Sequence, residues 1–195
     1  SKWLGWLDIV NDERANLVRY RELHGDREAA GFKDVLLMGM GGSSLCPEVL
    51  AKTFGKNNFR ILDSTVPSQV ITAESKLDIA KTLFIVASKS GTTLEPNCFK
   101  QYFFDRVEKT VGKGNAGKQF IAITDPGSKM QKIAEQDGFR HVLYGKPEIG
   151  GRFSALSAFG LGPAALMGLD VEKLLDAAGS MVRSCKATNP NENPG

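Results

Sequence analysis

Two short turns rich in glycine and hydroxyl side chains are the segments of this chain best suited to chemistry. Residues 39–44 read GMGGSS and residues 88–93 read SKSGTT. Each follows a short apolar run and precedes a helical pattern, so each turn presents hydroxyls and unpaired backbone N–H groups at the start of a helix. Helix starts of this kind bind anions. The two turns together predict a single phosphate site.

The second turn is the more specific of the two. Four of the six residues in 88–93 carry a hydroxyl, and Gly91 relaxes the backbone between them. A capping box between Thr92 and Glu95 would account for only one of these hydroxyls. A phosphate group accepts many hydrogen bonds, so the turn can hold it without an arginine. Lys89 either adds charge to the site or stays solvated.

The first turn also admits two other interpretations. Gly39 and Gly41 match the first two glycines of a dinucleotide-binding fingerprint, but Ser44 stands in the third place. Asp63 lies at about the right distance for the acidic residue of that fingerprint. The purely structural alternative is that the glycines only permit a tight turn, with Ser43 as the N-cap of the following helix.

A third motif, IGGRFS at residues 149–154, carries an arginine. The two glycines ahead of Arg152 let its guanidinium project from a tight turn. The alternative is an ordinary loop arginine held by a surface carboxylate.

Five apolar runs alternate with longer amphipathic stretches, and this order predicts the elements that position the three motifs. The longest runs are continuously hydrophobic, which is typical of parallel strands covered on both faces. The expected strands are residues 34–40, 59–63, 82–88, 119–124 and 141–144, and the expected helices are 15–31, 47–54, 68–77, 95–111, 128–137, 153–167 and 171–185.

This alternation predicts an α/β fold with helices on both faces of one sheet. With right-handed crossovers it forms a doubly wound, three-layer sandwich around a mostly parallel sheet of five strands. Ligands of such sheets bind at the carboxyl ends of the strands, near the point where the strand order reverses. Both hydroxyl-rich turns fall at such ends.

The composition is that of a soluble globular domain and excludes several classes of function. The 195 residues carry a formal charge of +3 with scattered lysines and arginines, which argues against a nucleic-acid partner. No apolar run is long enough to span a membrane. Cys46, Cys98, Cys185, His24 and His141 are isolated, so we expect no metal site and no disulfide, but buried or partly buried thiols in a reducing cytoplasm.

Together, residues 39–43, 88–96 and 150–157 resemble the first sugar-isomerase (SIS) domain of the phosphoglucose isomerases, in order and in spacing. The resemblance extends from about residue 35 to the end of the chain and implies a flavodoxin-like topology. It divides the chain into a helical lead-in (1–30), the SIS domain (31–186) and a linker (187–195) to a second SIS domain. The residues before about 35 match the family less clearly. This divergence would suit an isomerase fused behind another enzyme, as in the bifunctional transaldolase/phosphoglucose isomerases.

The resemblance implies an aldose–ketose isomerase of glycolysis and gluconeogenesis that interconverts glucose 6-phosphate and fructose 6-phosphate without a cofactor, as a homodimer. Gly151 and Arg152 would lie beside the sugar C1–C2 region, where the arginine stabilises a cis-enediolate. The implied phosphate ligands are Ser43, Ser88, Lys89 through its backbone, Ser90 and Thr93, supported by Gly41, Gly42, Gly91 and Thr92.

Aldose–ketose isomerisation also needs a base, and an acid to open the ring. In the family a glutamate, a histidine and a lysine from later in the protein and from a partner subunit supply these groups, and no position here matches their motifs. We therefore expect the isolated chain to bind sugar phosphate weakly without turnover.

Two other SIS proteins remain as alternatives: a non-catalytic sugar-phosphate sensor, and the SIS domain of a glucosamine-6-phosphate-forming aminotransferase. Both would keep the hydroxyl turns; the sensor would not need the Arg152 motif, and the aminotransferase domain would lack it. An exposed apolar face is expected where a second domain packs, with residues 153–167 as the candidate.

Overall fold

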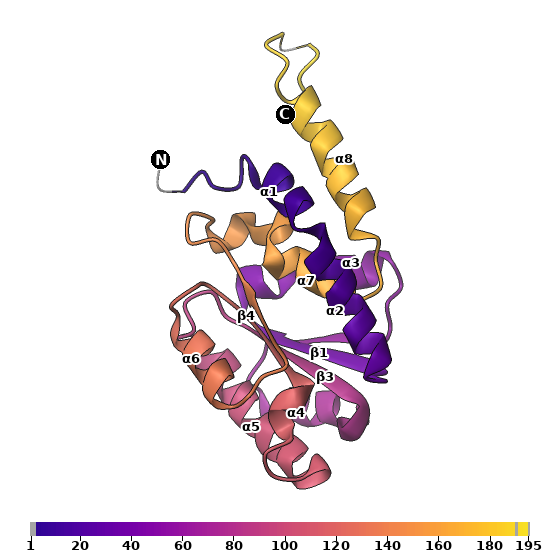
Figure 1. The fold of residues 1–195 in the computed structure, drawn as a ribbon, viewed down its shortest axis with the longest axis vertical. Coiled ribbons are helices and arrows are strands. Elements are labelled where there is room, and N and C mark those ends of the chain that lie inside the picture. Colours follow the sequence, from indigo (N-terminus) through magenta and orange to yellow (C-terminus); the bar gives the residue numbers. More distant parts are fainter. Residues whose placement is uncertain (1–2, 190, 195) are drawn as a thin grey trace.

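The computed structural model describes residues 3–189 and 191–194. Its core is a sheet of five strands in the order β2-β1-β3-β4-β5, and every neighbouring pair is parallel. This order is the flavodoxin-like one, so the predicted fold is confirmed (Figure 1). The strands are β1 (Asp34–Gly39), β2 (Phe59–Leu62), β3 (Thr82–Ala87), β4 (Phe120–Thr124) and β5 (His141–Tyr144).

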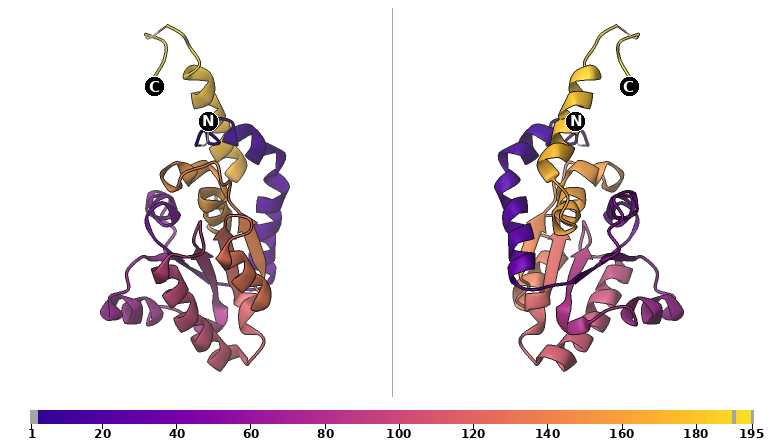
Figure 2. Two further views of the ribbon diagram at one scale, coloured as in Figure 1. Left: turned by 90° about the vertical axis from the view of Figure 1, so that its left-hand side faces the viewer. Right: turned by 90° about the vertical axis from the view of Figure 1, so that its right-hand side faces the viewer.

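Helices cover both faces of the sheet, because successive side chains of each buried strand point to opposite faces. In β1, Val35 and Leu37 join one apolar core, and Leu36 and Met38 join the other. The first face carries α1 (Ile9–Ala15), α2 (Leu17–Ala29), α3 (Leu45–Thr53), α7 (Ala158–Leu166) and α8 (Val171–Ser184). The second carries α4 (Pro67–Glu74), α5 (Leu94–Val111) and α6 (Lys129–Gln136), and Figure 2 gives two side views of these layers.

Most of the segment expected to expose an apolar face, residues 153–167, is instead buried in α7. All nine residues of α7 are buried. A helix that is hydrophobic all round belongs in a core, and α7 fills the space between α2, α3 and the sheet. The helix expected over residues 153–167 is also two elements: a 3₁₀ helix, η4 (Gly151–Leu156), comes first, and Ser157 then caps α7 by accepting a hydrogen bond from the Phe159 N–H at 3.3 Å.

The first helix expected from the sequence is present, although its bounds differ. The helix predicted from residue 15 begins at Leu17, and a separate helix, α1, precedes it. Among the described residues, no helix combines the length and the apolar character needed to cross a membrane.

The order in which strands are added to the sheet reverses between β1 and β3, which are parallel neighbours. After β1 it leaves toward α3 on one face, and after β3 it leaves toward α5 on the other. The last residues of the two strands, Gly39 and Ala87, are paired in register. Residues 39–44 and 88–93 therefore begin side by side at the switch point of the sheet.

Candidate functional site

The first hydroxyl-rich turn requires glycine at two positions, for different reasons. A Cβ atom on Gly39 would lie 3.1 Å from the Ala87 carbonyl oxygen, and Gly41 has a φ of +55°, which favours glycine. Ser43 closes a short 3₁₀ helix, η1 (Gly41–Ser43). Ser44 is the N-cap of α3, and its side chain makes no capping bond. The interpretation of Ser43 as the N-cap is therefore wrong.

The first turn packs directly against the arginine motif. A Cβ atom on Gly42 would lie 2.3 Å from the Gly151 carbonyl oxygen. The Ser154 hydroxyl donates to the same carbonyl at 2.8 Å and lies 3.4 Å from the Gly42 carbonyl oxygen. Two motifs more than a hundred residues apart thus share one backbone contact.

The second turn is held by its own hydroxyls and by α6. Ser90 Oγ lies 2.8 Å from Thr92 Oγ1 and accepts a hydrogen bond from the Thr92 N–H at 3.2 Å. Gly91 has a φ of +70°, and a Cβ atom there would lie 2.3 Å from the Met130 nitrogen. The glycine is therefore required both by its conformation and by the close approach of α6.

The start of α5 is free of side-chain capping. Its N-cap is Thr93, whose side chain makes no capping bond, so the alternative of a capping box between Thr92 and Glu95 is not observed. The Asn97 side chain in the first turn of α5 instead holds the second hydroxyl-rich turn. Its amide donates to the Thr93 carbonyl at 2.6 Å and to the Gly91 carbonyl at 3.2 Å. The first N–H groups of this 18-residue helix lack intrahelical partners and carry the positive end of its dipole.

Ser88 places a hydroxyl at the base of the second turn. The residue is 2% exposed, and its Oγ is buried without a hydrogen-bond partner among the described residues. Its backbone is fully engaged, since the N–H donates to the Ile123 carbonyl at 3.0 Å and the carbonyl accepts from Thr124 Oγ1 at 2.7 Å. Buried polar groups are rarely left unpaired, so the hydrogen-bonding capacity of this hydroxyl is unused among the described residues.

The Lys89 side chain is partly buried, and its charge is paired. Its ammonium group pairs with the Asp125 carboxylate and donates to the Lys146 carbonyl at 2.9 Å, while the Asp125 N–H donates to the Lys89 carbonyl at 3.0 Å. This contact ties together the segments that follow β3, β4 and β5. Sequence reasoning missed Asp125 here, although its place directly after an apolar run was the available signal.

Arg152 is exposed and forms no hydrogen bond or ion pair with any residue that the structure describes. The alternative of a loop arginine held by a carboxylate is therefore not what is observed. The arginine lines a hollow of about 370 Å³ with Gly150, Gly151, Phe153 and, unexpectedly, Trp3.

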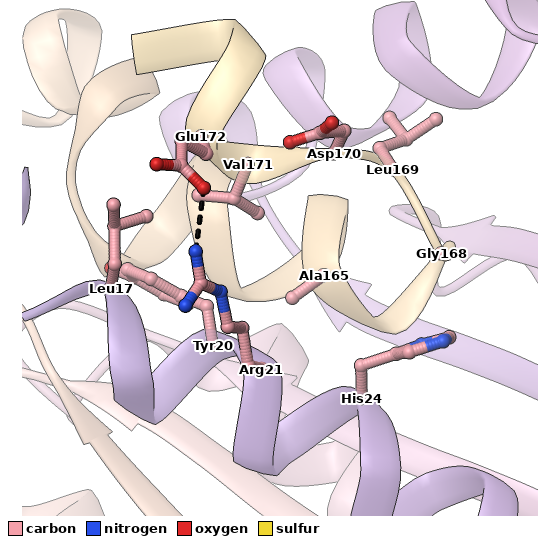
Figure 3. A pocket seen from close by; sticks show the side chains of 10 residues that line it. All are labelled: Leu17, Tyr20, Arg21, His24, Ala165, Gly168, Leu169, Asp170, Val171 and Glu172. Carbon is pink, nitrogen blue, oxygen red and sulfur yellow. Dashed lines mark hydrogen bonds and ion pairs between the residues drawn. The ribbon is translucent and has the colours of Figure 1, made fainter.

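A second hollow, of about 270 Å³, lies between α2 and the turn from α7 to α8 (Figure 3). Arg21 and Glu172 form an ion pair of 2.5 Å across it, and His24 points toward Gly168. None of the predicted site residues lines this hollow, so it lies apart from the candidate site.

The histidines and cysteines that could bind a metal lie far apart in the sequence and form no cluster among the described residues. Within residues 3–189 and 191–194, no three His, Cys, Asp or Glu side chains gather where they could hold a metal. His141 pairs with Asp26 at 2.7 Å. Of the thiols, only Cys46 is partly buried, as expected, and burial raises its pKa; Cys98 and Cys185 are exposed, contrary to expectation.

The chain matches the phosphoglucose isomerase family over residues 16–194. It is 35% identical to a glucose-6-phosphate isomerase of Thermus thermophilus over 179 residues, which cover 90% of this chain and 42% of that protein. A crystal structure of a hypothetical protein from the same organism superposes with a TM-score of 0.86 at 31% identity, covering all of this chain and 46% of the other. For a glucose-6-phosphate isomerase from Chlamydia trachomatis the TM-score is 0.77 at 26% identity, covering 88% and 34%.

The chain thus spans less than half the length of these similar proteins. The family match covers most of the chain, including all three motifs and the elements that position them. This chain belongs to the phosphoglucose isomerase family.

Proposed function

We propose that this chain is the sugar-phosphate-binding first SIS domain of a cytoplasmic glucose-6-phosphate isomerase. The observation that carries the proposal is the convergence of three separate motifs. Gly42 packs against Gly151, the two hydroxyl-rich turns begin from paired strand ends, and the buried Ser88 hydroxyl lacks a partner among the described residues. The sensor and aminotransferase alternatives do not require the arginine motif, and the curated relatives are isomerases.

The phosphate would be bound by the two turns. Ser43, Ser88, Ser90 and Thr93 supply hydroxyls, and the start of α5 supplies backbone N–H groups and a favourable dipole. Lys89 would contribute through its backbone, because Asp125 holds its ammonium group. An alkyl phosphate needs several such donors, since its terminal oxygens accept many hydrogen bonds.

The sugar would extend from the phosphate toward the arginine motif. Arg152 has no partner among the described residues, so its guanidinium is available for the negative charge of a cis-enediolate. Preorganised cationic donors of this kind stabilise the transition state more than the ground state.

Proton transfer between C1 and C2 requires a base that we assign outside this chain. A second SIS domain and a partner subunit of a homodimer would supply the base and the ring-opening acid. We keep the division of the chain into a helical lead-in (1–30), the SIS domain (31–186) and a linker (187–195); residues 190 and 195 of that linker lie outside the described residues.

The test is a titration of this chain with fructose 6-phosphate and with inorganic phosphate, followed by NMR amide shifts, beside a coupled isomerase assay. We expect both ligands to shift the amides of Ser43 and residues 88–93, with no turnover. Glucose, which lacks the phosphate, is the control and should shift none of them. Shifts that avoid these residues would contradict the site. Turnover that disappears in Arg152→Ala would contradict the assignment of the base to another part of the protein.

A further inference from the structure

The segment Trp3–Leu7 (hereafter the Trp segment) lies against residues 148–154. These residues carry Arg152 and include the start of η4, and we call them the Arg152 loop. The Gly5 N–H donates to the Glu148 carbonyl at 3.3 Å. Gly5 also fits closely, since a Cβ atom there would lie 2.9 Å from the Glu148 Cβ atom and 3.2 Å from the Ile149 Cγ1 atom. The Trp segment therefore contacts the backbone of this loop just ahead of its glycines.

An aromatic stack makes the second contact. The Trp6 ring lies 5.7 Å from the Phe153 ring between centroids, with an angle of 20° between the planes. Phe153 follows Arg152 directly in the sequence. Both rings stay partly exposed, at 38% for Trp6 and 50% for Phe153, so the stack lies at the protein surface.

The loop has firm anchors on either side of Arg152 but little support at the arginine. On one side Ile149 is 1% exposed and belongs to the core that includes Ile9. On the other side Ser154 is 4% exposed and bonds back to the Gly151 carbonyl. Gly150 and Gly151, which have no side chain to pack, lie between them, and the stack on Phe153 holds the residue that follows Arg152.

We propose that Trp6 is a positioning residue for Arg152. By stacking on Phe153 it holds the Arg152 loop where Gly151 packs against Gly42, and it thereby fixes the arginine relative to the phosphate turns. The role of the loop toward the sugar rests on the proposed function. The positioning itself is a property of the chain without ligand.

The ligand-free test compares Trp6→Ala, Phe153→Ala and the double variant with the unchanged chain. Backbone ¹⁵N relaxation of residues 150–154 measures the order of the loop. We expect both single variants to make these amides mobile and the double variant to add little, because partners in one contact are not additive. Trp6→Phe keeps a ring for the stack and should restore the order.

The matched control is Phe54→Ala. Phe54 is 49% exposed, close to the value for Phe153, and lies at the end of α3 with no ring contact among the described residues. This variant should leave the relaxation of residues 150–154 unchanged. An ordered loop in Trp6→Ala, or equal loosening in Phe54→Ala, would overturn the proposal.

The affinities for two ligands add a second measurement. A merely structural role of Trp6 would not change the affinity for fructose 6-phosphate relative to that for inorganic phosphate. In Trp6→Ala the affinity for inorganic phosphate should stay unchanged, while that for fructose 6-phosphate falls roughly threefold to tenfold, as expected for loss of one aromatic contact. An equal loss for both ligands would count against positioning and indicate general unfolding. If the unchanged chain binds neither ligand, the proposed function fails, and the relaxation data still decide the role of Trp6.

Discussion

Gly42 lies so close to Gly151 that a Cβ atom on Gly42 would stand 2.3 Å from the Gly151 carbonyl oxygen. The neighbour is backbone, so it cannot turn aside as a flexible side chain would. We therefore expect Gly42→Ala to push the Arg152 loop away from the first turn and to lower the free energy of unfolding by about 1–3 kcal/mol. Urea unfolding measures the loss, and the amide shifts of residues 150–154 report the displacement.

The control for this substitution is Gly25→Ala, in the middle of α2. A Cβ atom there meets nothing within 4 Å, and alanine is favoured over glycine in a helix by up to about 1 kcal/mol. This variant should be as stable as the unchanged chain or more so. If Gly42→Ala behaves in the same way, the contact between the two motifs is not as close as described.

Ser88→Ala separates binding from stability. The Ser88 hydroxyl is buried without a partner among the described residues, so its removal breaks no internal hydrogen bond there and should leave the free energy of unfolding within about 0.5 kcal/mol of its original value. If the hydroxyl donates to phosphate, the affinity for inorganic phosphate should fall about tenfold to a hundredfold, because hydrogen bonds to charged groups contribute about 1.5–3 kcal/mol. Urea unfolding and the NMR titration measure the two quantities.

Thr124→Val is the contrasting variant. The Thr124 hydroxyl contacts the Ser88 carbonyl at 2.7 Å, the Lys89 carbonyl at 3.2 Å and Ser128 Oγ at 2.7 Å. Its loss should cost about 1–3 kcal/mol of stability. A Ser88→Ala protein that is equally destabilised, with unchanged phosphate affinity, would assign Ser88 a purely structural role.

Strand positions and the switch point could be predicted because they depend on local patterns. Each strand is a short apolar run, and β1 and β3 are buried almost throughout, so their signal is strong. The order of the sheet follows from right-handed crossovers and the positions of the turns. The same patterns placed Ser43 and residues 88–93 at one edge.

The surroundings of the arginine motif could not be predicted because they depend on contacts between distant segments. Nothing in the sequence near Trp6 indicates that it stacks on Phe153, almost 150 residues later. The burial of α7 was also missed, since an all-apolar helix reads equally well as a core element or as an interface. The ion pair of Lys89 could not be predicted either, because its partner Asp125 follows a different strand.

Asp26 should make stability depend on acid pH. The Arg140 guanidinium, which donates at 2.5 Å and 2.7 Å, and then the His141 ring lower the Asp26 pKa from its ordinary 3.8 to about 2. The unfolded chain therefore takes up this proton first as the pH falls. The contribution of Asp26 is present above about pH 4 and is lost as the pH approaches 2.

Asp26→Asn removes this charge with little change of shape. Urea unfolding between pH 7 and pH 2.5 should show the variant less stable than the unchanged chain at neutral pH, with a difference that shrinks below about pH 4. A difference that stays constant down to pH 2.5 would mean that the contribution of Asp26 does not depend on its charge.

The three thiols should differ in reactivity. Cys98 and Cys185 are exposed, whereas Cys46 is half-buried near the Ala155 carbonyl, and burial raises its pKa. Only the thiolate reacts with a disulfide reagent, so Cys46 should react roughly tenfold or more slowly than the other two. Mass spectrometry after timed labelling identifies each site, and Cys46→Ser should abolish the slow phase. Three thiols that react at one rate would show that the packing of α3 on η4 opens readily.

Arg152→Ala tests the division of labour between the phosphate turns and the arginine motif. In the complete enzyme, loss of a donor to a developing oxyanion should lower kcat by about 10²–10³-fold, or about 3–4 kcal/mol. The affinity for inorganic phosphate should stay unchanged, because the proposed phosphate ligands do not include Arg152. Steady-state kinetics with fructose 6-phosphate gives kcat and KM, and competition by inorganic phosphate gives the binding constant. An equal loss of phosphate affinity and turnover would instead make Arg152 a phosphate-binding residue, and the sugar would then have to lie on the other side of the Arg152 loop.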